Sequence, residues 1–169
     1  LIKNASELSF GPFEEQDIKR ELSAEKSILL VQGLEQYFKS VRMLIASYFD
    51  FIPAWQLDDV MASVNYNSTS CGAHFDQYDV FLLQHTGEKT WHFDEITHSD
   101  DDLDTNSELR LLKNFSPTNE IIAREGDLIY VPPGVGHHGL AAEGSITLSI
   151  GIRNPTPLEI LGDFCSFLM

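Results

Sequence analysis

A His-x-Asp triplet, residues 74–76, is the first candidate for chemistry in this chain. It opens the stretch HFDQYDVFLLQ, whose apolar residues favour a β-strand. Side chains two apart on a strand point to one face, so the His74 imidazole and the Asp76 carboxylate would lie side by side. Both groups are common metal ligands, and the triplet therefore predicts part of a metal site. The plain alternative is the polar end of a strand, because the pattern also arises by chance.

A third ligand has to come from another part of the chain. The other histidines are His85, His92, His98, His137 and His138. His85 has the wrong strand parity relative to His74, and His92 has the wrong parity relative to Trp91, which we expect to face inward. His98 falls in a polar, loop-like segment. Parity and composition leave His137 and His138 as candidates and do not choose between them.

The segment before these two histidines resembles a cupin motif. In GDLIYVPPGVGH, Gly126 is followed by Pro132-Pro133-Gly134 and then by His137. This spacing is similar to the second metal-binding motif of the cupins, and the resemblance implies that His137 binds metal at the mouth of a barrel. Two histidines and one carboxylate leave open positions on the metal and are typical of non-haem Fe(II) oxygenases. A structural zinc site would prefer four ligands, usually including cysteine.

Oxygenases of this kind commonly use 2-oxoglutarate, whose far carboxylate needs a cation inside an apolar barrel. Lys89 is the candidate because it shares strand parity with Trp91; the alternative is an exposed lysine after a hairpin turn. Asn65 is expected to add a hydrogen bond to the co-substrate, and Arg153 is the rival cation. Candidate lining residues of the pocket are Tyr66, Tyr78, Thr147 and Ser149, and Thr147 is also expected to help bind the co-substrate.

The elements that would position these residues begin with helices. EEQDIKRELS predicts an amphipathic helix, and ILLVQG predicts a short buried strand. Apolar residues at helical spacing then predict one continuous helix over residues 34–49.

From residue 57 onward the pattern is that of β structure. DDVMASVNYN alternates, with Met61, Ser63 and Asn65 on one face. HFDQYDVFLLQ and TWHF predict a hairpin around the turn TGEK, and residues 94–119 predict a polar, solvated loop. Further strand-turn-strand patterns follow to residue 153. We therefore expect a mainly β domain with helical decoration, in the form of a double-stranded β-helix or cupin-like jelly roll.

Composition limits the classes of protein and partner. The 169 residues include 26 acidic and 11 basic ones, for a net charge of −15, which disfavours naked nucleic acid and favours basic partners. Solubility alone is the other explanation of that charge. No apolar run reaches the roughly 20 residues of a membrane helix. The two cysteines, Cys71 and Cys165, fit no zinc spacing and predict a reduced, cytoplasmic protein.

Four segments resemble the JmjC-type ribosomal oxygenases: AWQLDDVMASV, HFDQYDVFLLQHTGEKTWHF, GDLIYVPPGVGHHG and SIGIRNPT. The resemblance is closest to their bacterial, RoxA-like branch, often called cupin-4 proteins, and runs from Leu29 to Pro155. It implies a dioxygenase that depends on Fe(II) and 2-oxoglutarate, although another divalent metal can replace the iron. It also implies hydroxylation of an arginine β-carbon in a large-subunit ribosomal protein.

Carried over by residue, the resemblance makes His74, Asp76 and His137 the iron ligands. Lys89 stands where the bacterial enzymes have an arginine, so it keeps the charge and loses the planar fork. Asn65 stands where a serine is expected to help bind 2-oxoglutarate.

The resemblance further implies partners and domain organisation. We expect a basic ribosomal protein as substrate, no direct nucleic-acid or membrane partner, and a homodimer for the full-length protein. Residues 1–157 would form the catalytic domain, and residues 158–169 would begin a helical dimerisation region that continues further. Two alternatives stay open: a cupin isomerase or dioxygenase that does not use 2-oxoglutarate, and a non-catalytic cupin binding module. The first cupin motif normally supplies two histidines and a glutamate, which speaks against the former.

Overall fold

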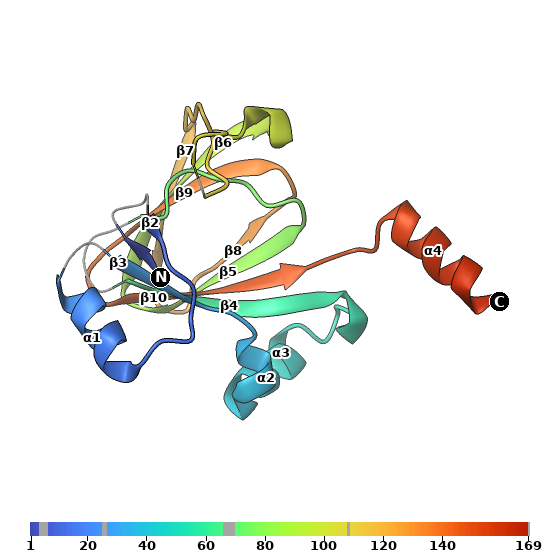
Figure 1. The fold of residues 1–169 in the computed structure, drawn as a ribbon, viewed down its shortest axis with the longest axis horizontal. Coiled ribbons are helices and arrows are strands. Elements are labelled where there is room, and N and C mark those ends of the chain that lie inside the picture. The colour runs from blue at the N-terminus through green and yellow to red at the C-terminus, as the bar shows by residue number, and fades with distance from the viewer. Residues whose placement is uncertain (4–6, 25–26, 66–69, 108, 169) are drawn as a thin grey trace.

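Two antiparallel sheets face each other in the computed structural model, which describes residues 1–169 except 4–6, 25–26, 66–69, 108 and 169 (Figure 1). In spatial order, the larger sheet consists of β2 (Glu7–Leu8), β1 (Ile2–Lys3), β3 (Ser27–Val31), β4 (Leu57–Asn65), β10 (Ser145–Ile152), β5 (Asp79–Thr86) and β8 (Leu128–Val131). The smaller sheet consists of β7 (Asn119–Arg124), β6 (Glu88–Thr97) and β9 (Val135–Ala141). The predicted jelly roll with helical decoration is confirmed.

The chain passes from one sheet to the other at a glycine corner, where a hairpin was predicted. Strand β5 pairs with β10 and β8, whereas β6 pairs with β7 and β9, so the predicted hairpin is wrong. Gly87 alone separates the two strands, and a tight hairpin needs at least about two loop residues. Its φ of 70° turns the chain into the opposite sheet.

The outer face of the larger sheet is covered by two short helices, α2 (Leu34–Tyr37) and α3 (Lys39–Tyr48), which lie below β4 in Figure 1. Val60 of β4 and Ile150 of β10 are both 0% exposed in the core under them. The predicted continuous helix over residues 34–49 is wrong at Phe38, whose φ of −111° and ψ of 115° are extended. Apolar spacing hid this break because both helices pack on the same apolar cluster.

The inner faces of the two sheets enclose an apolar part and a polar part. The apolar part is the cluster of Val80, Leu82, Trp91, Phe93, Ala123 and Val131. The polar part, here called the buried polar cluster, consists of Ser63, Asn65, Gln84, Lys89, Ser145 and Thr147. The predicted alternation of β4 is confirmed, because Ser63 and Asn65 belong to this interior while Val60 packs on the helices. Buried polar side chains need hydrogen-bonding partners, which makes this cluster a candidate part of a ligand-binding site.

The segment between β6 and β7 is more ordered than the predicted polar loop. Strand β6 extends to Thr97, and a short 3-10 helix, η2 (Asp100–Asp102), follows with a capping box. Leu103 and Leu112 are buried against Phe75 in a third apolar cluster. Single leucines without periodicity give no strand or helix signal, which is why the sequence pattern indicated a solvated loop here.

Three further elements complete the chain: α1 (Glu15–Ala24), the 3-10 helix η1 (Ala54–Gln56) and α4 (Pro157–Phe167). Helix α4 follows β10 through an extended link, stands apart from the sheets (Figure 1), and is exposed along its length. Its assignment to a dimerisation region stays a prediction. Among the described residues, no helix is long and apolar enough to cross a membrane.

The core under α2 and α3 should be the main source of stability of the larger sheet. Ile150→Ala removes a side chain that is 0% exposed and should lower the free energy of unfolding by about 2 to 5 kcal/mol. Ile160→Ala is the matched control, because that side chain is 56% exposed on α4 and should change stability by less than about 0.5 kcal/mol. Urea unfolding followed by circular dichroism measures both, and equal losses would contradict this assignment of the core.

Candidate metal centre

Three side chains from two separate segments meet at one end of the interior. His74, Asp76 and His137 each offer a ligand atom, and these atoms all lie within 4.8 Å of one another. The structure therefore brings together the three residues that the sequence predicted.

The backbone that carries them differs from the prediction. Strand β5 begins only at Asp79, so the strand expected from residue 74 is wrong at its start. His74 instead forms an isolated bridge with His137: His74 N donates to His137 O at 3.0 Å, and His137 N donates to His74 O at 2.8 Å. Gly134 N donates to Asp76 O at 2.7 Å. These three hydrogen bonds, rather than strand parity, set the relative positions of the ligands.

Backbone carbonyls fix the tautomer of both histidines. His74 Nδ1 lies 3.0 Å from Gly72 O, and His137 Nδ1 lies 3.1 Å from Val135 O. A carbonyl oxygen only accepts hydrogen bonds, so Nδ1 must carry the proton in both rings. Each Nε2 then presents a lone pair, which is the form that binds a metal ion.

The electrostatics also fit a cation. Burial, together with the nearby His74, lowers the pKa of His137 to about 3, so its ring is neutral at neutral pH. Burial raises the pKa of Asp76, and the attraction of His74 offsets part of that rise. His137 Nε2 lies 3.6 Å from Asp76 Oδ2. An imidazole binds a metal when it is neutral and a carboxyl group when it is ionised, so a divalent cation fits these residues and would relieve the desolvation of Asp76.

The centre opens into a cavity of about 340 Å³, a volume within the usual range for small-molecule sites. His74 and Asp76 line it directly, and His137 sits behind them. Ser63, Cys71, Tyr78, Lys89, Trp91 and Ser149 form further parts of its wall, and Leu109, Arg110 and Leu111 reach it from the segment before β7. Sequence patterns gave no local signal for the residues from that segment, which come close only through the tertiary fold.

Lys89 points into this cavity from the smaller sheet and is only 6% exposed, so the alternative of an exposed hairpin lysine is wrong. Its Nζ lies 4.4 Å from the centroid of the Trp91 ring and donates to Ser63 Oγ over a long 3.4 Å. Burial lowers the pKa of Lys89 to about 8. A Cβ at Gly139 would overlap Lys89 Cε and approach Trp91 Cζ3 to 2.8 Å, so the glycine makes room for this inward lysine. A buried ammonium next to a cavity is suited to bind an anion.

The other two predicted co-substrate residues lie deeper. Asn65 and Thr147 are each 1% exposed and do not line the cavity. Thr147 Oγ1 donates to Gln84 Oε1 at 2.9 Å, and Gln84 Nε2 donates to Ser145 Oγ at 2.9 Å. Thr147 therefore supports the wall, whereas Ser63, one strand away, faces the cavity. Ser63 shares its face with Asn65, so strand parity could have identified it.

The remaining candidates can be placed as well. Arg153 pairs with Glu159 at 2.6 Å on the surface, which excludes it as the cavity cation. Tyr78 and Ser149 line the cavity as predicted, and Tyr66 lies outside the described residues. His85 is exposed, and His92 pairs with Glu120 at 3.0 Å. His138 lies near His92, with ring centroids 6.2 Å apart, and not in the metal group.

Several known proteins are similar to this chain in sequence and in fold. The chain is 35% identical to a probable ribosomal oxygenase of Haemophilus influenzae, over 92% of this chain and 39% of that protein. It is 31% identical to the ribosomal protein uL16 3-hydroxylase of Escherichia coli, over 96% of this chain and 42% of that protein. The structure of the E. coli ribosomal oxygenase YcfD in complex with cobalt and 2-oxoglutarate superposes with a TM-score of 0.75. That match has 30% identity and covers 95% of this chain and 40% of YcfD.

The chain thus spans about two fifths of the length of the relatives it matches. The family model for the JmjC domain matches residues 44–160, which include β4 through β10 and all three residues of the metal group. The chain therefore belongs to the JmjC-domain family.

Proposed function

We propose that this chain is the catalytic domain of a protein hydroxylase that depends on Fe(II) and 2-oxoglutarate and modifies a ribosomal protein. The observation that carries the proposal is one cavity with His74 and Asp76 on its wall, His137 grouped with them, and a buried lysine elsewhere on the same wall. Relatives named as a ribosomal oxygenase and a ribosomal protein hydroxylase support it.

His74 Nε2, one oxygen of Asp76 and His137 Nε2 would hold the iron. When bound, the iron supplies the activation of dioxygen that couples oxidative decarboxylation of 2-oxoglutarate to hydroxylation of the substrate. The protein contributes geometry: Gly72 O and Val135 O hold the imidazole rings through Nδ1, so that both Nε2 atoms stay directed at one point.

Lys89 would bind the far carboxylate of 2-oxoglutarate, with help from Ser63. An ammonium in a dry cavity makes a strong charge-assisted bond with a carboxylate, and Trp91 keeps water from its other side. Thr147 and Gln84 hold the wall behind Ser63 in place. We propose an indirect role for Thr147 and Asn65, since both lie behind the cavity.

A basic ribosomal protein is the proposed substrate, with an arginine β-carbon as the proposed position of hydroxylation. The net charge of −15 would attract a basic partner and repel naked nucleic acid. Beside the cavity, the Asp100 carboxylate is an example of an acidic group that binds a guanidinium. It pairs with Arg110 at 2.7 Å and accepts from Gln77 Nε2 at 2.9 Å. A cytoplasmic location and a homodimeric full-length protein, with residues 158–169 in the dimerisation region, belong to the same proposal.

Lys89 also separates this function from its alternatives. A cupin enzyme that binds metal and an uncharged substrate has no use for a lysine buried in its cavity, because charge burial destabilises the fold unless an anion compensates. A non-catalytic module would need neither the lysine nor the open metal positions.

Activity is the first test of the proposal. The full-length protein, incubated with Fe(II), 2-oxoglutarate and ribosomal proteins, should add one oxygen atom to a basic ribosomal protein and release succinate, measured by mass spectrometry. Asp76→Ala should abolish both products because it removes a charged metal ligand. Failure of the unaltered protein to form succinate with any ribosomal protein would refute the proposed function.

The affinity for 2-oxoglutarate should depend on pH through Lys89. Because the pKa of Lys89 is about 8, the ammonium is mostly charged below pH 8 and mostly neutral above it. In the Mn(II)-loaded protein, calorimetry should show the dissociation constant of 2-oxoglutarate rising about tenfold between roughly pH 7 and pH 9. Lys89→Met should bind more weakly at low pH and show no such dependence. If the pH dependence persisted in Lys89→Met, a titrating group other than Lys89 would be its cause.

Lys89 should also cost stability when no anion is bound. Its pKa is lowered from 10.5 to about 8, so the penalty is fully present below pH 8 and fades as the pH rises towards 10.5. At neutral pH, Lys89→Met should therefore raise the free energy of unfolding by about 3 kcal/mol. Thermal unfolding without 2-oxoglutarate measures this gain, and a clear loss of stability would show that the lysine has a structural role.

A further inference from the structure

A second carboxylate–histidine pair is buried on the other side of the smaller sheet. The side chains of Asp94 and His98 are 3% and 4% exposed, and His98 Nε2 lies 2.6 Å from Asp94 Oδ2. Neither residue lines the cavity, and the proposed reaction uses neither. Burying such a pair costs desolvation that apolar side chains of similar size would not incur, so stability alone explains it poorly.

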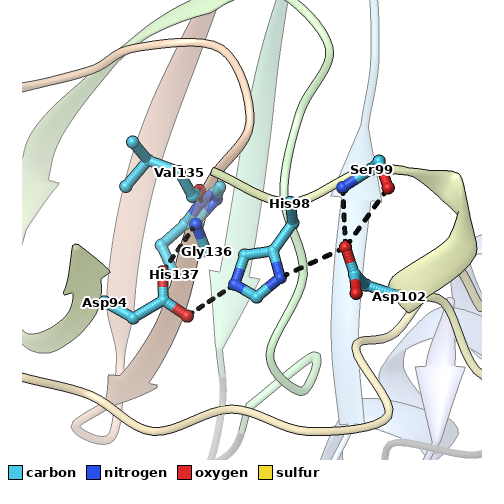
Figure 2. A network of polar contacts seen from close by, with 7 residues as sticks. All are labelled: Asp94, His98, Ser99, Asp102, Val135, Gly136 and His137. Atoms are coloured by element: carbon cyan, nitrogen blue, oxygen red, sulfur yellow. Dashed lines mark hydrogen bonds and ion pairs between the residues drawn. The ribbon is translucent and has the colours of Figure 1, made fainter. Parts of the chain in front are cut away.

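The pair is bonded to the segment that leads into His137. Asp94 Oδ1 accepts a hydrogen bond from Gly136 N at 3.2 Å, and His98 N donates to Gly134 O at 2.8 Å. Figure 2 shows both side chains lying against the backbone of Val135–His137. A Cβ on Gly136 would come within 2.8 Å of both Asp94 carboxylate oxygens and of His98 Nε2, so the contact requires a glycine.

The same histidine also touches the segment that carries the other two ligands. The His98 ring stacks on Phe75, with centroids 6.1 Å apart and an interplanar angle of 27°. Phe75 lies between His74 and Asp76 in the chain. On the far side of the ring, Nδ1 lies 3.8 Å from Asp102 Oδ2, a carboxylate that accepts from Ser99 N at 2.9 Å (Figure 2). His98 is thus held between η2 and the two ligand-bearing segments.

We propose that Asp94 and His98 form a positioning pair for the metal centre. The carboxylate orients the Gly136 amide and so fixes the approach of His137, while the His98 ring holds Phe75 and with it the spacing of His74 and Asp76. The inference rests on the proposed metal site. Its physical basis is that a metal site keeps its affinity only while its ligands stay within about 0.5 Å of the productive geometry.

Metal affinity tests this role without reference to turnover. Anaerobic titration of the full-length protein with Co(II), followed by its visible ligand-field absorption, gives the dissociation constant directly. Asp94→Ala leaves the Gly136 amide and the His98 ring without their acceptor and should weaken Co(II) binding about tenfold or more. Asp94→Asn should lose less, because its amide oxygen can still accept from Gly136 N. Gly136→Ala should weaken binding as well, since its methyl group pushes the intact pair away.

Two controls separate positioning from general loss of structure. Glu120→Gln alters another carboxylate–histidine pair, the one with His92 between β6 and β7, and should leave the Co(II) affinity unchanged. Phe49→Leu destabilises the distant core under α2 and α3 and should also leave it unchanged. All titrations are run well below the unfolding temperature of each variant.

The outcomes distinguish this inference from the proposed function. Wild-type Co(II) affinity in the folded Asp94 and Gly136 variants, or an equal loss in Phe49→Leu, would overturn the positioning role alone. Absence of Co(II) binding by the unaltered protein would overturn the metal site and the inference with it. If Asp94→Ala does not fold, the order of affinities among wild type, Asp94→Asn and Gly136→Ala decides.

Discussion

The two backbone hydrogen bonds between His74 and His137 are the constraint on which the site depends. They join a segment that belongs to no regular strand to the first residues of β9, and so they bring candidate ligands 63 positions apart in the sequence into one group. Because the bonds run between main-chain atoms, they leave both imidazoles free to point into the barrel. Gly134 N adds the third connection, to Asp76 O. The Nδ1 contacts to Gly72 O and Val135 O then orient the two imidazole rings.

The interior is divided into an apolar and a polar part, and this division determines which side chains surround the cavity. Trp91 and the residues around it form a dry wall, and the buried polar cluster closes the other end. Lys89 lies where the two parts meet, beneath the Trp91 ring, in space that exists because residue 139 is glycine. An ammonium in this position costs stability and is suited to hold an anion, so function rather than folding accounts for it.

Much of the fold and the site followed from local pattern. Period-two alternation in β4 put Ser63 and Asn65 on one face, which is the interior face, and parity put Lys89 on the same face as Trp91. The pairing of strands did not follow, because the choice of hydrogen-bonded neighbour for each strand is decided by packing over the whole chain. A glycine corner at Gly87 therefore looked like a hairpin turn. His98 was misplaced for a related reason: its neighbours are polar, but Asp94, Phe75 and Gly136 cover it only after the barrel has closed.

In the proposed function, His74, Asp76 and His137 hold a metal ion which 2-oxoglutarate then chelates in the cavity. Anaerobic addition of Fe(II) and 2-oxoglutarate to the full-length protein tests it through the visible charge-transfer absorption of the chelated iron. Chelation at these residues predicts a saturable band at one iron per chain that is absent in Asp76→Ala and in His137→Ala and is weakened in Lys89→Met. No band with the unaltered protein, or an undiminished band in the two ligand variants, would contradict it.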